Sequence, residues 1–403
     1  MRRRLLIGSA IGASILAMVG VSTTTAQAKA PGPGFTTAVY GDSPYGSGVA
    51  DPSTGVVDSW TPAHPTTWQL EHTPQFISSI NADPDVSLVT HVGDIHSGKD
   101  YCALSYDQAV AADWSAFADS VVYTPGDNEW SDCHKSGEGS QDPLTNLGYV
   151  RSTFFATPGA TPGGGGQTVT SQATAYDRAH PQDAQFVENV MFEKTAGTAG
   201  VLFVTLNIPG GSNNDADPWF GAGETAEQAA AQATERQQRT DADLRWLDAA
   251  FATAKAHKDK SVVIIEQADM WDLDGKTPSH LTNYDSIIQS IAAHTLAFDK
   301  PVLLFAGDSH QYRSDNPLRQ GAPCTIESGP TTTVPCSNDA WANHQATLGT
   351  INVPDSLFHR VIVHGSTTPL EWLKLTVSPT DNPTTDHSFG RFSWARQATG
   401  LAP

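Results

Sequence analysis

The chain has 403 residues, and its 43 acidic side chains outnumber its 23 lysines and arginines, which gives a formal net charge of −20. No basic stripe runs along the sequence, so nucleic-acid binding is excluded as the main activity. The length is sufficient for one large domain or two ordinary ones.

The first 28 residues are predicted to be a secretory signal peptide. Met1–Arg4 is a positively charged start, Leu5–Val21 is apolar, and Ala26–Ala28 is an A-x-A cleavage signal. A retained membrane anchor is the alternative, but the apolar run is short and is diluted by Gly and Ser. We therefore expect a secreted, extracytoplasmic protein with no stable membrane span after cleavage.

Strand-like and helix-like segments then alternate, as in an α/β fold. Hydrophobic periodicity predicts helices at 67–80, 106–119, 142–155, 224–257 and 284–298. Short apolar runs predict strands at 36–40, 86–92, 121–124, 262–265, 302–305, 360–364 and 370–377, with a hairpin at 190–208. We expect one domain over 36–378, with inserted loops at 157–180 and 312–350, an irregular segment at 325–343 and a C-terminal tail at 379–403.

The four cysteines form an even number in a chain predicted to be exported, which favours disulfide bonds. Chain order suggests the pairs Cys102–Cys133 and Cys324–Cys336, although sequence alone allows three connectivities. A zinc cluster is the less favoured alternative, because the chain has no C-x-x-C pair.

Four of the strand-like runs end in Gly-Asp. In an open α/β sheet, ligands bind outside the carboxyl ends of the strands, and glycine lets the backbone turn sharply there. Any one of these aspartates alone would be explained by a turn or a helix cap. Four carboxylates crowded together need a cation or a shared proton, so we predict a metal site at Asp42, Asp94, Asp127 and Asp308.

The order and spacing of these motifs resemble the calcineurin-like metallophosphoesterase superfamily. The family pattern runs D-x-H, G-D-x-x-x-x-G, G-N-H-D/E, a lone His after a strand, and G-H-x-H. Its counterparts here are Gly41–Pro44, Gly93–Gly98, Gly126–Glu129, Ile265–Gln267 and Gly307–His310. The resemblance implies a four-layer α/β/β/α sandwich of two mixed sheets. It also implies a secreted, metal-dependent phosphoric ester hydrolase that uses metal-activated water on a small phosphorylated substrate, either a phosphomonoester or a phosphodiester.

The resemblance also assigns the first metal position. Asp94 matches the aspartate that bridges two metals, and Asp42 matches the aspartate of the first metal. His310 matches a histidine ligand of that same metal. Pro44 replaces the histidine of the first motif and cannot coordinate.

The second metal position departs further from the family. Asp127 stands where the family has an asparagine ligand, although a one-residue shift would make Asn128 the ligand instead. Asp308 and Gln267 stand where the family has histidines. Replacing imidazole by carboxylate and amide oxygen favours Mn²⁺, Mg²⁺ or Ca²⁺ over Zn²⁺, with Fe as a further option. The site is expected to hold one or two ions.

The resemblance leaves the general acid open. The acid histidine of the family aligns with Asn128, which cannot donate a proton, and His134 beside Cys133 is one replacement. The candidate catalytic residues are therefore Asp94, Asn128 and His134.

Three further side chains are candidates for substrate binding, namely His96, Arg313 and His364. For His96 a satisfied loop histidine, and for Arg313 a surface salt bridge, are the simpler alternatives. The substituted ligands also leave a second function open, a catalytically impaired metallophosphoesterase-like binding protein of the cell envelope.

Overall fold

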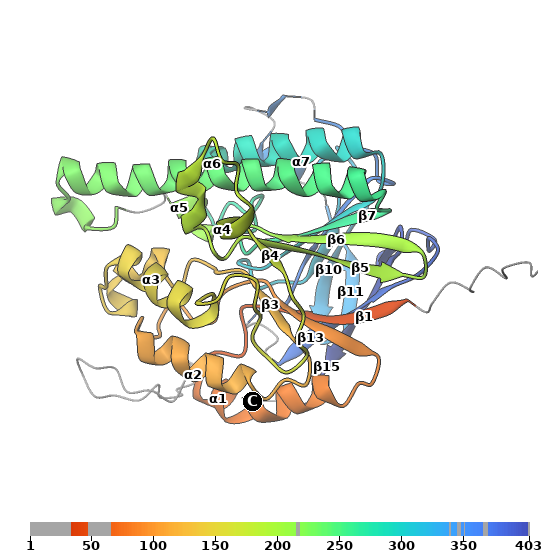
Figure 1. The fold of residues 1–403 in the computed structure, drawn as a ribbon, viewed down its shortest axis with the longest axis horizontal. Coiled ribbons are helices and arrows are strands. Elements are labelled where there is room, and N and C mark those ends of the chain that lie inside the picture. Colours follow the sequence, from red (N-terminus) through yellow and green to blue (C-terminus); the bar gives the residue numbers. More distant parts are fainter. Residues whose placement is uncertain are drawn as a thin grey trace, which may run out of the picture. The chain divides into compact units, whose positions relative to one another are not determined.

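Two mixed β-sheets with helices packed against them form the described part of the chain, a mixed α/β fold seen in the computed structural model of Figure 1. The structure describes residues 34–46, 66–214, 218–337, 340–344, 348–349, 351–365 and 370–401. These residues all belong to one unit, Pro31–Pro403. The predicted signal peptide lies outside them and stays a prediction.

The first sheet has six strands in the order β14-β15-β13-β1-β2-β3. Strands β1, β2 and β3 are parallel, whereas β13 is antiparallel to β1 and β15 is antiparallel to β13. Parallel neighbours need a crossover connection, which helices supply here. The bounds are β1 (Phe35–Tyr40), β2 (Val86–His91), β3 (Val121–Tyr123), β13 (Glu371–Val377), β14 (Ser388–Phe389) and β15 (Phe392–Ala398).

The second sheet has nine strands in the order β11-β10-β9-β12-β8-β7-β6-β5-β4. Its four central strands run parallel to one another; they are β6, β7, β8 and β12. The strands on both sides of this centre pair with their neighbours in the antiparallel direction. The bounds are β4 (Thr170–Ser171), β5 (Val190–Ala196), β6 (Ala199–Thr205), β7 (Ser261–Ile265), β8 (Val302–Ala306), β9 (Arg313–Asp315), β10 (Cys324–Gly329), β11 (Thr332–Pro335) and β12 (Phe358–Ile362).

Three hydrophobic clusters hold the layers together. One lies between the sheets, one between the first sheet and helices α1 to α3, and one between the second sheet and helices α6 and α7. Figure 1 shows α6 and α7 on one side of the sheets and α1 and α2 on the other. The helix bounds are α1 (Thr66–Asn81), α2 (Leu104–Trp114), α3 (Pro143–Phe154), α4 (Gln172–Ala175), α6 (Ala226–His257), α7 (Asp285–Phe298) and α8 (Ala340–Asn343); α5 (Gly210–Asn214) is a left-handed turn.

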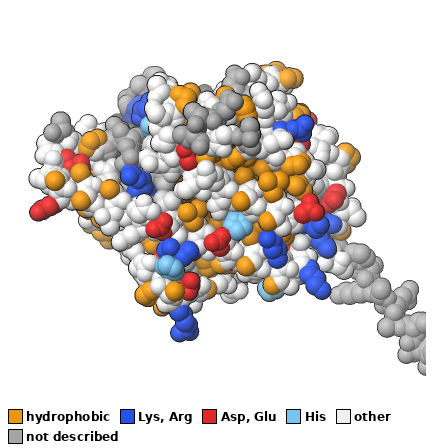
Figure 2. Space-filling view, turned by 90° about the horizontal axis from the view of Figure 1, so that it is seen from above, with side chains coloured by type: hydrophobic (Ala, Val, Ile, Leu, Met, Phe, Trp, Pro, Cys, Tyr) orange, Lys and Arg blue, Asp and Glu red, His pale blue; other side chains and the backbone are white. Residues whose placement is uncertain are grey.

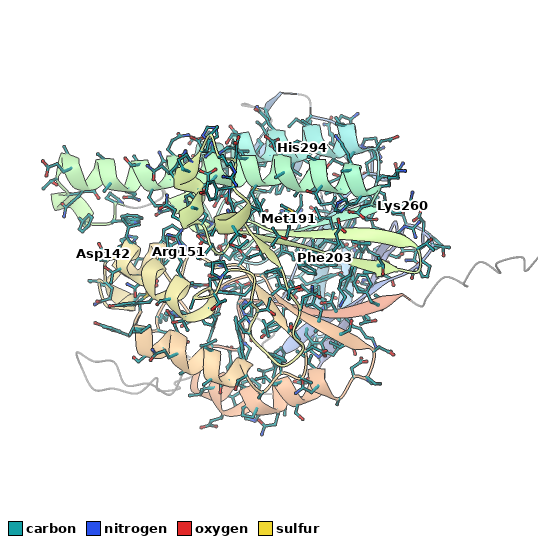
Figure 3. All side chains as sticks on the ribbon, in the orientation of Figure 1. Asp142, Arg151, Met191, Phe203, Lys260 and His294 are labelled. Atoms are coloured by element: carbon teal, nitrogen blue, oxygen red, sulfur yellow. A yellow bond between two sulfur atoms is a disulfide. The ribbon has the colours of Figure 1, made fainter. Side chains whose placement is uncertain are left out.

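Local sequence signals explain where the principal helices begin. Asp142 caps α3 by accepting a hydrogen bond from the backbone N–H of Thr145 (2.7 Å). Thr225 and Gln228 form a reciprocal capping box at the start of α6. Figure 3 labels Asp142, just before the start of α3, and Arg151, in its last turn, which pairs with the buried carboxylate of Glu188 (2.7 Å).

Two segments differ from the sequence prediction. The segment expected to be irregular, 325–343, contains the hairpin β10–β11, which the bond Cys324–Cys336 closes. The expected tail, 379–403, contributes β15, which pairs with β13 along its whole length. The sequence prediction missed β10, β11 and β15, because these strands are short and contain few apolar residues.

Both predicted disulfides, Cys102–Cys133 and Cys324–Cys336, are confirmed, and they fit an oxidising, extracellular environment. Among the described residues, no helix has the length and apolar character needed to cross a membrane. On the face shown in Figure 2, lysine and arginine side chains are scattered among acidic ones and form no stripe.

Arg360 is the most fully enclosed cation of the second sheet. Its guanidinium, 1% exposed, donates to both carboxylate oxygens of Asp315 (2.9 Å each) and to Asp269. Burial opposes the charge, but the two carboxylates raise the pKa of Arg360, and Arg360 in turn lowers the pKa of Asp315 despite its burial. This ion cluster joins β12 to β9 and to the loop after β7.

Substitution Arg360→Met should lower the free energy of unfolding by about 3–5 kcal/mol, because it leaves the buried Asp269 without its cation and Asp315 with only Arg313. Arg319→Met is the matched control, since Arg319 is half-exposed and pairs with Asp355 at the surface; its effect should stay below about 1 kcal/mol. Urea denaturation of both variants measures the difference. Equal losses would show that the Arg360 cluster contributes no more than a surface pair.

Candidate functional site

The carboxyl ends of strands from both sheets meet around one cavity of about 350 Å³. Asp94 follows β2, Asp127 follows β3 and Asp308 follows β8, and all three side chains line this cavity. Asp42, which follows β1, joins them by accepting a hydrogen bond from the backbone N–H of Asp308 (2.9 Å). The structure therefore brings together the four predicted aspartates on one rim.

Three of these aspartates have backbone torsions in the left-handed region, with φ of 53° at Asp42, 56° at Asp94 and 69° at Asp308. Asp tolerates this region better than most residues, because its short polar side chain hydrogen-bonds locally. The preceding Gly93 has a φ of 108°, which only glycine adopts readily. These sharp turns aim the side chains across the strand ends, and such strain is typical of functional sites.

Crowding changes the protonation of the carboxyl groups. Burial, followed by the charge of Asp127, raises the pKa of both Asp94 and Asp308 well above the ordinary value. Burial, with the charge of Asp132 next in size, raises the pKa of Asp127 to about 7. In the metal-free protein these groups therefore retain protons that isolated carboxyls would lose.

Asp42, Asp94 and His310 form a group that can hold a cation, since one ligand atom of each lies within 4.8 Å of the others. His310 Nε2 lies 3.2 Å from Asp42 Oδ1. Burial lowers the pKa of His310, but the hydrogen bond to Asp42 outweighs it and raises the pKa overall. Asp42 is fully buried, and its Oδ2 has no hydrogen-bond partner. An orphaned carboxylate oxygen beside two other ligand groups fits a cation site.

Tyr45, an alternative ligand that its position beside Pro44 suggests, is not among the selected site residues but belongs to this group. Its buried hydroxyl lies 3.2 Å from Nε2 of His310. Burial, and then the charges of Asp42 and Asp94, raise the pKa of Tyr45 well above the ordinary value, so the phenol stays protonated. The available signal was its position one residue after Pro44, where the family histidine is missing.

Gln267 and Asn128 both reach the aspartates, but with their amide nitrogens. Gln267 Nε2 donates to Asp94 Oδ2 and to Asp127 Oδ1, at 3.0 Å in each case. Asn128 Nδ2 donates to Asp94 Oδ2 (3.1 Å). The amide oxygen of Gln267 accepts a hydrogen bond from the backbone N–H of Gly210 (2.7 Å). Both residues predicted as ligands thus lie in the site, with hydrogen-bond donors toward the carboxylates.

The left-handed turn α5 forms one wall of the cavity. Its residues 211–214 have φ values between 57° and 64°, and each non-glycine residue in this conformation costs about 1–2 kcal/mol. The buried Arg239 holds the turn by donating to Asn213 Oδ1 (2.5 Å) and to the Asn207 carbonyl (3.1 Å). At Gly210, a Cβ atom would lie 2.5 Å from Asp127 and 2.6 Å from Asp308, so this position requires glycine.

Two predicted substrate-binding histidines lie outside the cavity. His96 is buried, stacks on Tyr106 and pairs with Asp107 (3.3 Å). His364 is buried between the carboxylates of Glu327 (2.7 Å) and Glu371 (2.9 Å). Its position near a strand end predicted that His364 would lie at the rim. Its ring nitrogens instead face the carboxylates of Glu327 and Glu371.

The other two predicted side chains also lie apart from the carboxylates. His134 Nδ1 lies 2.8 Å from the carbonyl of Ser131, and its side chain does not line the cavity. Its position next to Cys133 predicted that His134 would lie near the site. Cys133 is buried, whereas the His134 side chain is half-buried outside the cavity. Arg313 pairs with Asp315 (2.9 Å) and lines a neighbouring cavity of about 250 Å³.

The cavity wall includes charged side chains that sequence reasoning missed. They come from loops rather than strand ends, so no periodic signal marks them. Asp132 and Asp269 lie within three residues of recognised motifs, and Lys135 pairs with Asp132. The missed charged lining residues are Asp132, Lys135, Asp269, Asp272, Asp274, Lys276 and His280.

The bond Cys102–Cys133 joins the loops that carry Asp94 and Asn128. The sulfurs of Cys102 and Cys133 lie 3.4 and 3.6 Å from the carbonyl oxygen of Asn128. The disulfide therefore supports the backbone that directs the Asn128 amide toward Asp94.

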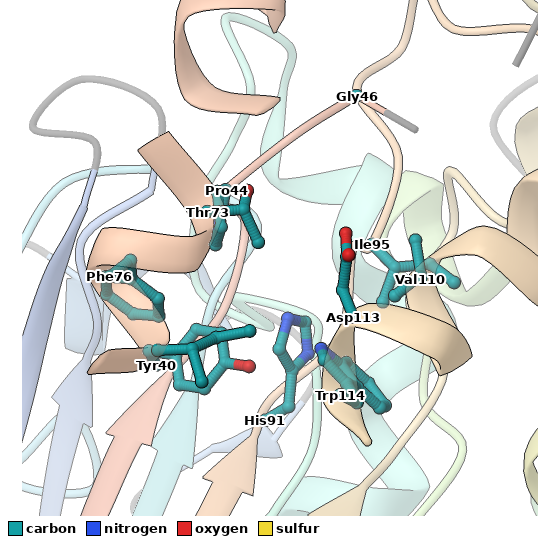
Figure 4. A pocket seen from close by; sticks show the side chains of 11 residues that line it. Tyr40, Pro44, Gly46, Thr73, Phe76, His91, Ile95, Val110, Asp113 and Trp114 are labelled. Carbon is teal, nitrogen blue, oxygen red and sulfur yellow. The ribbon is translucent and has the colours of Figure 1, made fainter. Parts of the chain in front are cut away.

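A second, much smaller cavity of about 20 Å³ lies behind the Asp94 loop (Figure 4). Tyr40, His91, Asp113 and Trp114 are among the residues that line it. Burial lowers the pKa of His91 to about 3, so the ring is neutral. Its Nδ1 accepts a hydrogen bond from the backbone N–H of Gly93 (3.1 Å) and so helps to fix the turn before Asp94.

No protein-family model and no curated protein matches the chain. Among solved structures, the chain is similar to GAP50, described as the anchor in the inner membrane complex of Plasmodium. The sequence identity is 7% and the TM-score is 0.42, and the match covers 92% of this chain and 86% of that chain. A TM-score this low carries no argument about function.

Replacing Cys102 and Cys133 by serine should weaken divalent-metal binding before it unfolds the core, because it releases the loops that carry Asp94 and Asn128. The double variant Cys324→Ser/Cys336→Ser is the control, since that bond closes a hairpin at a sheet edge. Calorimetric titration with Mn²⁺ at a temperature where both variants remain folded measures the effect. Equal affinities in the two variants would contradict the bracing role.

The metal-free protein should lose stability as pH rises from about 4 to 7. An unfolded Asp loses its proton near pH 4, whereas folded Asp127 keeps its proton up to about pH 7. The folded state binds more protons in this window, so the free energy of unfolding falls with pH, and the contribution of Asp127 to this fall ends above about pH 7. Thermal melts in chelator should show this fall, and it should be shallower in Asp127→Asn. An identical slope in the variant would remove Asp127 as the cause.

Proposed function

We propose that the chain is a secreted calcineurin-like metallophosphoesterase, a hydrolase of phosphoric esters built as a four-layer α/β/β/α sandwich. The single observation that supports this most is the meeting of Asp94, Asp127 and Asp308 at one cavity, with Asp42 hydrogen-bonded to the backbone of Asp308 and each aspartate within four residues of a strand end. They occur in the order and spacing of the family motifs. The combination of sequence order and spatial convergence is more specific than either alone.

The donor set fits a divalent cation. Asp42, Asp94 and His310 offer two carboxylates and one imidazole within reach of a single ion, a set compatible with Mn²⁺ or Mg²⁺ and also with Fe. Such an ion, when bound, supplies a Lewis acid that polarises a phosphoryl oxygen and acidifies water. The mutual repulsion that raises the carboxyl pKa values in the metal-free state is relieved by a positive charge at this position.

We assign phosphate binding and proton donation by considering the remaining side chains at the cavity. Lys135 and Lys276 line the cavity and offer ammonium groups to the oxygens of a bound phosphoryl group. Asn128 holds Asp94 in place but has no proton to donate to a leaving group. The imidazole at the rim of the cavity, His310, belongs to the proposed cation ligands and is therefore not a general acid. Substrates with good leaving groups, such as aryl phosphates, should therefore react best.

The second candidate is a metal-binding protein of the cell envelope without catalytic activity. The observation that favours it is the excess of acidic groups on the cavity wall, including Asp269, Asp272 and Asp274. This negative field attracts a phosphate dianion less strongly than a net positive centre would. Metal binding without turnover of an aryl phosphate would support this candidate.

Asp94→Asn tests the proposal by removing one charge at nearly constant shape. We expect the variant to lose aryl phosphatase activity and the rise in melting temperature that Mn²⁺ gives the wild type. At a free metal concentration a hundred times Kd, that gain corresponds to about 2.7 kcal/mol. Without metal the variant should be at least as stable as wild type, because it relieves repulsion among buried carboxylates.

Asp274→Asn is the matched control, since Asp274 lines the same cavity but is exposed and outside the proposed ligand set. It should keep both activity and the metal-dependent gain. An Asp94→Asn protein that gains as much from metal as wild type would remove Asp94 from the ligands and the proposal with it.

A further inference from the structure

We infer that this centre holds one divalent cation, at Asp42, Asp94 and His310, and that the side-chain amide of Gln267 takes the place of a second. The inference rests on the proposed function, since it specifies the metal content of the same site. It differs from the two-ion arrangement that the motif resemblance implies, in which Asp94 bridges both ions.

The hydrogen bonds of Asp94 leave it too few lone pairs to bridge. A carboxylate has about four acceptor positions. Asp94 already accepts from the Asn128 backbone N–H (3.3 Å), the Asn128 side-chain amide (3.1 Å) and the Gln267 amide (3.0 Å). About one acceptor position remains, which suffices for a single ion. By contrast, Oδ2 of Asp42 has no hydrogen-bond partner.

At the position that a second ion would occupy, the carboxylates of Asp94 and Asp127 already accept hydrogen bonds. The NH₂ group of Gln267 contacts Asp94 and Asp127 at once, at 3.0 Å each. A cation that bridged the same two oxygens would meet these N–H groups rather than lone pairs. The Gln267 amide thus offsets part of the negative charge of Asp94 and Asp127. In a two-ion site, the second cation would offset this charge.

The amide cannot simply turn its oxygen toward the site. Its Oε1 accepts from the backbone N–H of Gly210 (2.7 Å), so a flip would bring two N–H groups face to face and set a carbonyl oxygen against Asp94 and Asp127. The stem is confined as well, because a Cβ at either Gly93 or Gly126 would lie only 2.6–2.7 Å from its carbons.

Gly210 itself is fixed by the strained turn α5. Arg239, fully buried in α6, holds that turn through the Asn213 side chain (2.5 Å) and backbone (3.3 Å). The orientation of the Gln267 amide is therefore set by a chain of contacts that runs from a helix, through a left-handed turn, to the aspartates. This explains why three non-glycine residues remain in an unfavourable conformation at this wall.

The test counts bound ions. Metal-depleted protein is equilibrated with Mn²⁺, and bound manganese per chain is measured by elemental analysis and by electron paramagnetic resonance, which distinguishes isolated from coupled ions. Wild type should bind one ion with the spectrum of an isolated Mn²⁺. Gln267→His and Gln267→Glu replace the amide donor by an acceptor, and both should bind two ions that are magnetically coupled.

The control is Gln311→His, which adds a histidine at an exposed position of the neighbouring cavity and should leave one ion. Two coupled ions in wild type would overturn the inference and leave the proposed function intact. No bound ion in wild type would overturn both. One ion in wild type and in both Gln267 variants would overturn the role of the amide. If the histidine variant does not fold, Gln267→Glu and the wild-type spectrum still decide.

Discussion

The repulsion among carboxylates at the strand ends is the constraint on which the rest of the site depends. Asp94, Asp127 and Asp308 line one cavity, and each carries a raised pKa because burial and its neighbours oppose its charge. Such an arrangement costs stability unless something compensates it. The architecture around the rim supplies three kinds of compensation: shared protons, amide hydrogen-bond donors and the proposed cation.

The supporting structure is correspondingly rigid. A disulfide, Cys102–Cys133, ties together the loops after β2 and β3. A buried arginine, Arg239, secures the left-handed turn, and a second one, Arg360, secures the loop after β7 through Asp269. Each of these anchors lies just behind the carboxylates. The site is therefore preorganised by anchors other than the four carboxylates themselves, which is how a site keeps like charges close together.

Much of the architecture was predictable because it depends on local pattern. The parallel strands are short, apolar and buried on both faces, and the strand-Gly-Asp pattern marks the point where each one ends. The capping box at Thr225 and the cap at Asp142 similarly mark the starts of α6 and α3. The strands β10 and β15 were missed, since each is short and contains few apolar residues, and their pairing with β9, β11 and β13 is visible only in the folded sheet.

In the candidate site too, some features follow from local sequence and others only from the tertiary structure. The sequence by itself determined that the four aspartates gather there, because an aspartate after a strand and a glycine has only one edge of the sheet to project from. Only the tertiary structure decided what each of them does. It turned the Gln267 amide nitrogen toward Asp94 and set Tyr45 against His310. It also buried His96 beside Asp107 and His364 beside Glu371, away from the cavity. These outcomes depend on side-chain direction and on partners such as Gly210 and Arg239, which are distant in sequence and adjacent only after folding.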